Sequence, residues 1–256
     1  MAPNQVLRVT YHPAMKIGNP PRSAWRNFPD VLMHARESAV KKHADYTAAK
    51  SGEISSARRV VESTLNDSMV KTLGSMASSA NPVLASVHAY EAQGINRIPA
   101  VFAEVLAERL GLRAETGIVQ SNRTGHTGAT GYHRLAHPAL FEGEVEPGRD
   151  YLLVDDFVGQ GGTIANLKGF IEARGGTAIG CTTLTGKPWS AKLAPSAETL
   201  RMLREKHGGE LENWWQDTFG YGFDFLTESE ARYLARADSV ELIRNRILAA
   251  RQAHDH

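Results

Sequence analysis

The spacing of apolar residues changes twice along the chain and divides it into three parts. In residues 1–80 the apolar positions recur at helical intervals. The segment "DVLMHARESAVKK" begins with Asp30, a suitable N-cap, and "SSARRVVESTL" carries apolar residues at Val60, Val61 and Leu65. We expect both segments to be helices, and residues before 81 to form a helical N-terminal extension.

Short apolar runs alternate with helical patterns in residues 81–186. The runs "PVLASVHAY", "ETGIVQSN", "YLLVDD" and "AIGCTTLTG" are typical of strands, whereas "PAVFAEVLAERLG" and "TIANLKGFIEARGG" have helical spacing. Gly111 is a suitable C-cap for the first helix, and Thr163 a suitable N-cap for the second. Strands that alternate with helices indicate a parallel sheet covered on both faces. The fold class is therefore α/β, with "YLLVDD" as a central strand.

Helical patterns return in residues 187–256. Ser196 is a suitable N-cap for "PSAETLRMLREKHGG", "TESE" (Thr227–Glu230) is a capping box, and "DSVE" (Asp238–Glu241) resembles one. Between the two boxes lies the most aromatic stretch, "WWQDTFGYGFDF". We expect a helical C-terminal part that forms one compact domain with the rest of the chain.

Composition excludes several classes of protein. The 256 residues include 29 Lys and Arg against 28 Asp and Glu, a formal charge of +1, which argues against a nucleic-acid or membrane coat. No apolar run approaches the roughly 18 residues needed to span a bilayer, and no secretory signal pattern opens the chain. Cys181 is the sole cysteine, so an internal disulfide and a thiolate zinc cluster are excluded. We expect a cytoplasmic protein with a buried thiol.

The segment "YLLVDDFVGQGGT" (Tyr151–Thr163) carries the clearest chemistry. Ligands of parallel sheets sit beyond the carboxyl ends of the strands, where Asp155 and Asp156 are expected. The glycines that follow, together with a helix N-terminus, would form a phosphate cradle. Sugar hydroxyls can donate to the acids while the phosphate accepts from the loop, so a sugar phosphate fits. The alternative is a solvated turn after a strand.

Two other glycine motifs do not fit this segment. A P-loop places Lys and Ser or Thr after its last glycine, but Gly162 is followed by Thr163 and Ile164. A dinucleotide-binding fingerprint that begins at Gly159 would require glycine in place of Ile164.

The segment resembles the thirteen-residue phosphoribosyl-pyrophosphate (PRPP) signature of the type I phosphoribosyltransferases, and the order of elements over residues 81–186 resembles their core. The resemblance implies that Asp155 and Asp156 face the ribose hydroxyls. It also implies that the 5′-phosphate is held by the loop residues Gly159, Gln160, Gly161, Gly162 and Thr163. Gln160 stands where the family usually has Thr or Ser, so one hydroxyl contact is lost.

Two further loops are assigned through the same resemblance. "HAYEAQGINRIP", with Glu91, Gln93 and Gly94, is a loose match to the pyrophosphate-binding loop, or else an ordinary connection. The long glycine-containing connection that begins "RTGHTGATGYHR" resembles the flexible lid of the family, in which Arg123 and His126 would stabilise pyrophosphate. A mobile solvated loop is the alternative. The C-terminal part would be a hood whose aromatic residues either stack on a base or form a core.

The resemblance implies an enzyme that transfers the phosphoribosyl group of PRPP to a nitrogenous acceptor, such as a nucleobase, and releases pyrophosphate. Asp155, Asp156, Arg123 and His126 would be catalytic, Mg²⁺ would arrive with PRPP, and no residue is assigned to the metal. The family resemblance also favours a homodimer. The alternatives are a non-catalytic PRPP or nucleotide sensor with the same fold, and an enzyme that cleaves N-glycosidic bonds.

Overall fold

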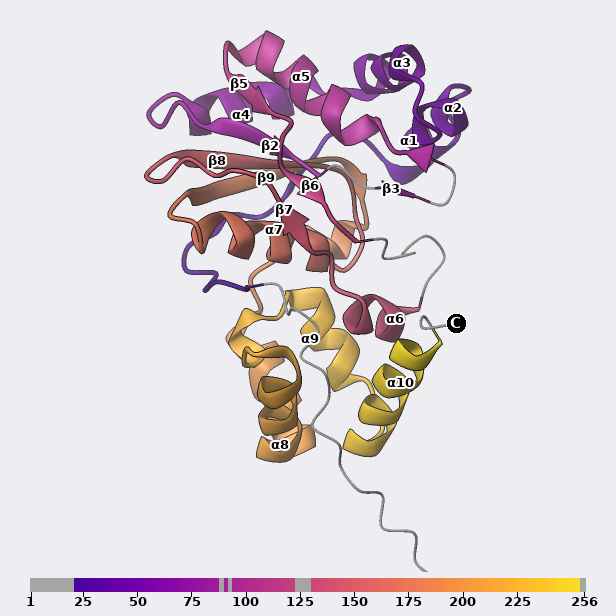
Figure 1. Cartoon of the computed structure of the whole chain (residues 1–256), viewed down its shortest axis with the longest axis vertical. Helices are drawn as coiled ribbons and strands as arrows, with labels where there is room; N and C mark the ends of the chain where they lie inside the picture. Colours follow the sequence, from indigo (N-terminus) through magenta and orange to yellow (C-terminus); the bar gives the residue numbers. More distant parts are fainter. Residues whose placement is uncertain (1–20, 88–89, 92–93, 123–129, 254–256) are drawn as a thin grey trace, which may run out of the picture.

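A five-stranded parallel sheet forms the centre of the computed structural model, which describes residues 21–87, 90–91, 94–122 and 130–253 (Figure 1). The strand order is β1-β9-β8-β2-β5, so the acid-bearing strand β8 lies in the middle. The α/β prediction and the central position of "YLLVDD" are therefore confirmed. The strands of this sheet are β1 (Leu32–Met33), β2 (Val83–Ser86), β5 (Arg113–Glu115), β8 (Asp150–Val158) and β9 (Thr177–Gly186).

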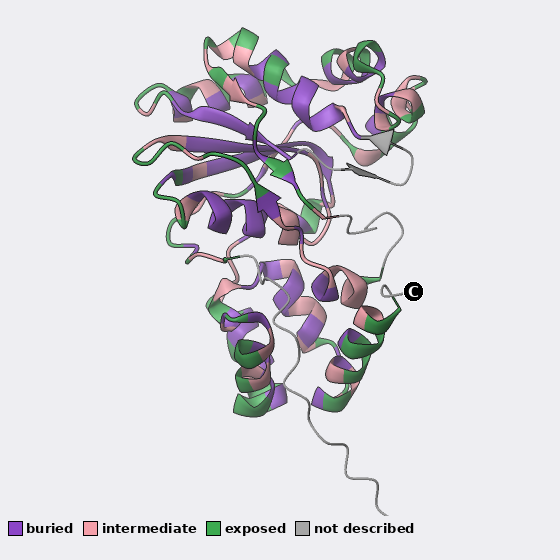
Figure 2. Cartoon of the chain, viewed as in Figure 1, coloured by how far each residue is buried: buried purple, intermediate pink, exposed green. Residues whose placement is uncertain are grey.

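Helices cover both faces of the sheet, as the alternating pattern predicts (Figures 1 and 2). On one face, apolar residues of α3, α4 and α5 pack against Leu84, Leu152 and Val154. On the other face, α7 packs against Leu153 and Cys181. The cysteine is buried, as expected. The helices of these two layers are α1 (Glu37–Lys41), α2 (Tyr46–Lys50), α3 (Ile54–Thr64), α4 (Asp67–Ala77), α5 (Ile98–Leu110) and α7 (Gly162–Glu172).

A separate helical layer lies beneath α7 in Figure 1, and we call it the hood. It consists of α6 (Gly131–Ala136), α8 (Ala197–Phe219), α9 (Glu228–Ala235) and α10 (Val240–Gln252), with the 3₁₀ turns η1 (Pro188–Ser190) and η2 (Phe223–Phe225) beside it. Its core is aromatic, and the rings of Trp215 and Phe219 stack with centroids 4.2 Å apart. None of the described helices is long and apolar enough to cross a membrane.

Local signals place several helix ends correctly. Thr227 and Glu230 form the predicted capping box, Ser196 caps α8, and Gly111 ends α5 in a left-handed conformation. Two predicted caps were wrong. The α7 helix begins at Gly162 and has no side-chain cap, and α10 is capped by Ser239 rather than by the residue before it.

The helix predicted over residues 30–42 is confirmed only in its second half, where α1 (Glu37–Lys41) lies, and its first half was wrong. Leu32 and Met33 instead form β1 and pair with Thr182 and Thr183 of β9, because pairing with the sheet outweighs a local helical preference. Residues from the N-terminal part thus complete the sheet, while the predicted three-part division of the chain stays a prediction.

The predicted strand in "ETGIVQSN" also differs from the structure. It gives only β6 (Val119–Gln120), which pairs antiparallel with β7 (Phe141–Glu142) outside the main sheet. The strand at that edge of the sheet is β5, which precedes it and pairs in parallel with β2.

Residues 21–29 form a strap that runs across α7 on the side facing the hood (Figure 1, indigo). The buried Lys168 of α7 donates to the hydroxyl of Ser23 (2.8 Å) and the carbonyl of Ala24 (2.9 Å). A Cβ on Gly169 would run into the carbonyl of Pro21, so the glycine is required for the strap to lie against the helix.

The strap also holds the hood. Arg22 makes a two-pronged ion pair with Glu230 of α9 (2.6 and 2.9 Å), and its Nε donates to Asn166 of α7 (2.8 Å). The indole of Trp25 donates to the carbonyl of Leu226 (2.7 Å). One short segment therefore links the sheet layer to the hood.

Two helical glycines offer a test of this packing. Glycine is about 1 kcal/mol less favourable than alanine inside a helix. Gly209 has open space around it and directly follows a break in α8 at Gly208, so Gly209→Ala should raise the free energy of unfolding by at most about 0.5 kcal/mol. Gly169→Ala should lower it by about 1–3 kcal/mol, because the strap must move. Urea unfolding of both variants measures the difference, and equal stabilisation by the two substitutions would contradict the packing role of the strap.

Candidate functional site

Asp155 and Asp156 lie within β8, close to its carboxyl end. The strand continues to Val158, which is in register with Gly186 of β9, and the glycine-containing loop begins after it. The acids therefore stand three and two residues before the end of the strand, beside β2 and β9 at the edge where the sequence predicts a ligand.

Two side chains that the sequence analysis did not identify contact Asp156. Its Oδ2 accepts a hydrogen bond from Lys50 Nζ, at the end of α2 (3.1 Å), and from Asn96 Nδ2, just before α5 (2.9 Å). Burial by itself would raise the pKa of Asp156, but the Lys50 charge and the Asn96 hydrogen bond hold this pKa below its usual value. Asp156 is therefore a carboxylate paired with a cation.

Asp155 has a different environment. The residue is only 8% exposed, and its Oδ1 accepts the backbone N–H of Asp156 (2.8 Å). Burial, and then the negative charge of Asp156, raise the pKa of Asp155 well above its usual value. The neighbouring acids are thus not equivalent, since the pKa of Asp155 is raised and the pKa of Asp156 is lowered.

Two carbonyl groups of the loop Gly159–Thr163 accept hydrogen bonds from side chains on the hood side of the molecule. Ser190 donates to the Gly159 carbonyl, and Thr227 donates to the Gln160 carbonyl (2.5 Å for Thr227). Gly161 has a φ of +81°, and a Cβ there would lie 2.5 Å from Leu193. A Cβ on Gly162 would lie 2.6 Å from Glu230 of the hood, so both glycines are required for close packing as well as for the shape of the loop.

Backbone amide groups of this loop point away from the residues that pin it. In a trans peptide the N–H lies opposite the carbonyl, so the amides of Gln160 and Gly161 face away from Ser190 and Thr227. The α7 helix then starts at Gly162, and Ala165 donates to the Gly161 carbonyl (2.9 Å). Amides in the first turn of a helix have no regular intrahelical acceptor, and they carry its positive dipole end.

A cation lies against the same loop. The space that a Cβ at Gly159 would fill is 2.6 Å from a terminal nitrogen of Arg134, a residue of α6. Burial lowers the pKa of the Arg134 guanidinium, so a nearby anion would stabilise its charge. The family resemblance points to this loop, but it assigns Arg123 and His126 as the cationic groups.

The other predicted site residues are placed only in part. Arg123, His126 and Gln93 lie outside the described residues. Glu91 and Gly94 belong to the β3 (Tyr90–Glu91) and β4 (Gly94–Ile95) hairpin, for which only the backbone is described. All of these assignments stay predictions.

The second half of the predicted lid is a helix. Residues 131–136 form α6, and Leu135 and Ala136 join the hood core. The side chain of Tyr233 occupies the space beside Gly131, so α6 lies close to α9. This half of the segment is therefore part of the packed hood, whereas residues 123–129 lie outside the described part of the chain.

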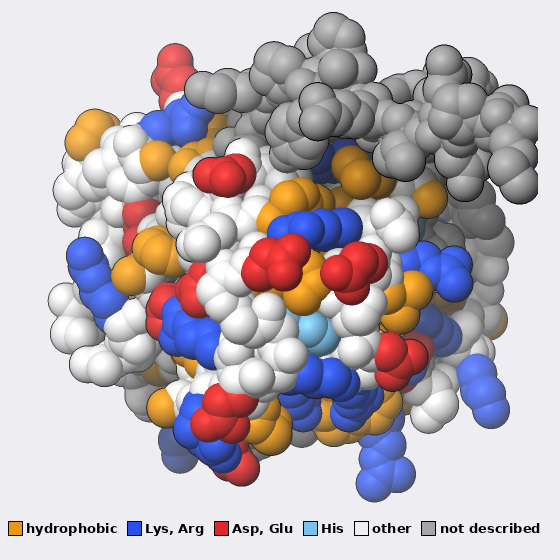
Figure 3. Space-filling view, turned by 90° about the horizontal axis from the view of Figure 1, so that it is seen from below, with side chains coloured by type: hydrophobic (Ala, Val, Ile, Leu, Met, Phe, Trp, Pro, Cys, Tyr) orange, Lys and Arg blue, Asp and Glu red, His pale blue; other side chains and the backbone are white. Residues whose placement is uncertain are grey.

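The hood does not present most of its aromatic residues as a stacking platform. Trp215, Phe219, Tyr221 and Phe223 are buried in its core, which confirms the alternative that they serve packing. Trp189 of η1 is 62% exposed. On the hood end of the molecule, acidic and basic side chains are interspersed (Figure 3), and they form the pairs Arg201–Glu205, Arg204–Glu212, Arg204–Asp224 and Arg244–Glu210.

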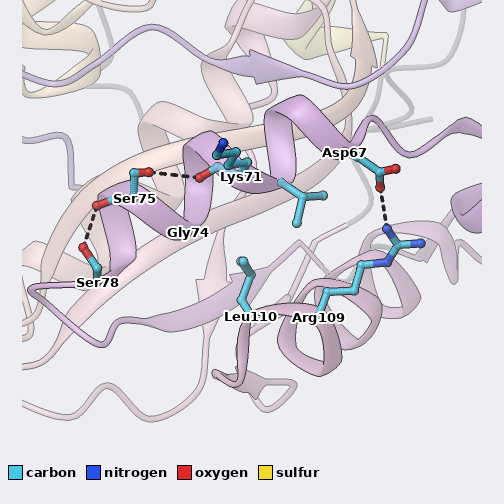
Figure 4. Close-up of a pocket in the computed structure, with 8 residues that line it drawn as sticks. Asp67, Lys71, Gly74, Ser75, Ser78, Arg109 and Leu110 are labelled. Atoms are coloured by element: carbon cyan, nitrogen blue, oxygen red, sulfur yellow. Dashed lines mark hydrogen bonds and ion pairs between the residues drawn. The ribbon is translucent and has the colours of Figure 1, made fainter.

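Two surface depressions lie elsewhere. A groove of about 760 Å³ runs between α4 and α5, where Lys71, Ser75 and the Asp67–Arg109 ion pair line it (Figure 4). A cleft of about 860 Å³ lies beside β1 and includes Met33 and Lys41. Neither contains a residue that the sequence predicts to bind a ligand. Within the described part of the chain, no three His, Cys, Asp or Glu side chains gather closely enough to hold a metal ion.

Two curated proteins resemble the chain in sequence. It is 43% identical over 230 residues to Protein TraN of Escherichia coli, a match that covers 90% of this chain and 51% of TraN. It is 36% identical over 151 residues to an uncharacterized protein of Haemophilus influenzae, covering 59% of this chain and 34% of that protein. The chain thus spans about half the length of the first relative and about a third of the second. No family model matches it.

Solved structures that resemble the chain include phosphoribosyltransferases. A purine phosphoribosyltransferase from Pyrococcus horikoshii has a TM-score of 0.33 and 18% identity, covering 48% of this chain and 74% of that one. Adenine phosphoribosyltransferase from Leishmania tarentolae has a TM-score of 0.35 and 16% identity, covering 69% and 70%. These TM-scores are too low to support an argument about function.

The predicted phosphoribosyltransferase activity, and with it the assignment as an enzyme, was wrong. The relative that matches 90% of the chain is named TraN and not as a phosphoribosyltransferase, and the likeness to phosphoribosyltransferase structures is weak. A thirteen-residue signature covers only one strand and the loop after it. An enzymatic activity also depends on the side chains that surround this strand and loop.

The unequal acids predict unequal effects of removing their charges. Asp155→Asn should leave the free energy of unfolding at pH 7 within about 0.5 kcal/mol of the wild-type value or raise it, because burial and the charge of Asp156 raise the pKa of Asp155 and so disfavour its charged form. Asp156→Asn should lower it by about 2 kcal/mol, because the ion pair between Lys50 and Asp156 is then lost. Urea unfolding measures both values, and a larger loss in Asp155→Asn would contradict this assignment.

The same pair predicts a pH dependence. The folded protein binds the Asp155 proton more tightly than the unfolded chain does, because the folded pKa is raised. The resulting stabilisation is full below the usual pKa of aspartate, and it is lost as pH rises through the raised pKa. Stability curves measured from pH 4 upward should therefore fall less steeply with pH in Asp155→Asn than in the wild type. Parallel curves would show that Asp155 ionises normally.

Proposed function

We propose that this chain is a non-catalytic protein that binds a phosphorylated sugar at the loop Gly159–Thr163. The observation that supports this most directly is the Arg134 guanidinium beside the loop, at the N-terminal end of α7. A helix N-terminus and an arginine both favour a phosphate group. The family signature found in the sequence overlaps the same residues.

The sugar would lie toward Asp156. An ionised carboxylate has about four acceptor positions, and Lys50 and Asn96 both use Oδ2. Remaining acceptor capacity can take hydrogen bonds from neighbouring hydroxyls. A ligand that combines phosphate and hydroxyl groups, such as ribose 5-phosphate or a nucleotide, would satisfy both the loop and the acid.

The charges around the acids favour binding over phosphoribosyl transfer. Two free carboxylates would stabilise positive charge that develops on a reacting sugar. Here the pKa of Asp155 is raised by burial, and the charge of Asp156 is offset by Lys50 at 3.1 Å. The site therefore offers hydrogen-bond acceptors with little net negative charge.

Calorimetry with ribose 5-phosphate, ribose and inorganic phosphate tests the proposal. Ribose 5-phosphate should bind more tightly than either fragment, because it engages both the loop and the acid. Arg134→Gln should weaken its binding at least about 10-fold, the effect of losing a charge-assisted contact of roughly 1.5 kcal/mol. The matched control is Arg149→Gln, which removes an arginine just before the opposite end of β8.

Two outcomes of these binding measurements would count against the proposal. Failure of the wild type to bind ribose 5-phosphate at millimolar concentration would contradict the proposed function. Equal weakening by Arg134→Gln and Arg149→Gln would show that binding follows overall charge rather than the loop.

A further inference from the structure

The groups around Asp156 do not fit a divalent cation. Mg²⁺ requires oxygen ligands in near-octahedral geometry. The Asn96 side chain accepts the Ile98 N–H at its Oδ1 (3.1 Å), so its amide nitrogen is the group that faces Asp156. Lys50 presents an ammonium group to the same carboxylate oxygen. Both neighbours therefore offer hydrogen-bond donors where a metal site needs acceptors.

We propose that Lys50 is a built-in counter-ion that replaces a divalent cation beside Asp156, so that the site binds its phosphorylated ligand without a metal. The claim that a phosphorylated ligand binds here rests on the proposed function. The claim that a divalent cation is excluded rests on the contacts of Lys50 and Asn96 with Asp156. It differs from the expectation, drawn from family resemblance, that Mg²⁺ arrives with the ligand.

The backbone fixes Lys50 in this position. It is the last residue of α2, and its side chain is 14% exposed. The preceding residue, Ala49, is fully buried, and its carbonyl accepts the N–H of Arg97 at the start of α5 (3.4 Å). The end of α2 and the residue before α5 thus approach Asp156 as one packed unit, so the ammonium group is held rather than swinging in solvent.

The positive charge of Lys50 is a second reason why a divalent cation does not fit beside Asp156. A divalent cation at the Asp156 carboxylate would be repelled by the ammonium group 3.1 Å from the same oxygen. Asp155 adds little attraction, since burial raises its pKa and favours its uncharged form. While Lys50 is present, Asp155 and Asp156 attract a divalent cation only weakly. Removal of the Lys50 charge should therefore increase the affinity of this site for a divalent cation.

Mn²⁺ alone is the probe for the first experiment, with binding followed by electron paramagnetic resonance. The wild type should show no Mn²⁺ site that depends on Asp156. Lys50→Met should gain a site at least tenfold tighter than any wild-type binding, and Lys50→Met combined with Asp156→Asn should lose it. Lys50→Arg keeps the positive charge and should resemble the wild type. Lys42→Met is the matched control, because it removes an exposed lysine just after α1.

If Lys50→Met does not fold, Lys50→Gln serves the same purpose. Mn²⁺ binding by the wild type that is lost in Asp156→Asn would overturn the proposal, as would the absence of any gain in the folded Lys50 variant. A gain in Lys42→Met equal to that in Lys50→Met would also overturn it, because general charge would then explain the result.

A second experiment tests metal independence through the ligand. Calorimetry of ribose 5-phosphate with the wild type should give the same dissociation constant, within twofold, in EDTA and in excess Mg²⁺. A tenfold or larger gain in affinity with Mg²⁺ would overturn the proposal. Absence of ribose 5-phosphate binding in both buffers would contradict the proposed function, while the Mn²⁺ experiment would still decide the role of Lys50.

Discussion

The buried ion pair between Arg22 and Glu230 determines how the layers of this protein fit together. Both side chains are 3% exposed, and the guanidinium also contacts Asn166 and the ring of Tyr221. Such a pair adds little net stability compared with apolar packing, but the loss of one partner costs about 3–5 kcal/mol because a buried charge is left alone. Its main effect is therefore positional. The pair fixes α9 against α7, and Thr227 at the start of α9 in turn fixes the glycine-containing loop.

The sequence predicts those parts of the fold that short-range patterns encode. Alternating strand and helix patterns predicted the sheet and the central place of β8, and the capping box at Thr227 predicted where α9 begins. The pattern after Asp30 misled because β1 forms only by pairing with β9, and nothing within the segment signals that partner. A two-residue edge strand is too short to leave a periodic signature.

In the candidate site, too, only the locally encoded part could be predicted from the sequence. The signature located two acids and a phosphate-type loop, whose position at the carboxyl end of a central strand follows from the topology. It could not reveal that Lys50 and Asn96 contact Asp156, because those residues lie 106 and 60 positions away in the chain. Arg134 lies in the segment assigned to the lid, but nothing in the local pattern distinguished it from Arg123 and His126. The chemistry of a carboxylate depends on such neighbours. The signature contains the two acids and the loop but none of the residues that contact Asp156, so it overstated the resemblance to an enzyme.

The place of β1 at the edge of the sheet has a consequence for how the chain folds. A bond between Thr182 and Leu32 spans 150 residues, and the Arg22–Glu230 pair spans 208. Contacts between distant segments form late, because the entropy of closing a long loop must be lost before they give any stabilisation. On a ribosome, which releases the N-terminus first, the strap and β1 have no partners until most of the chain has emerged. In the interval before β9 emerges, β8 has an unpaired edge, the kind of surface through which unfinished chains associate with one another.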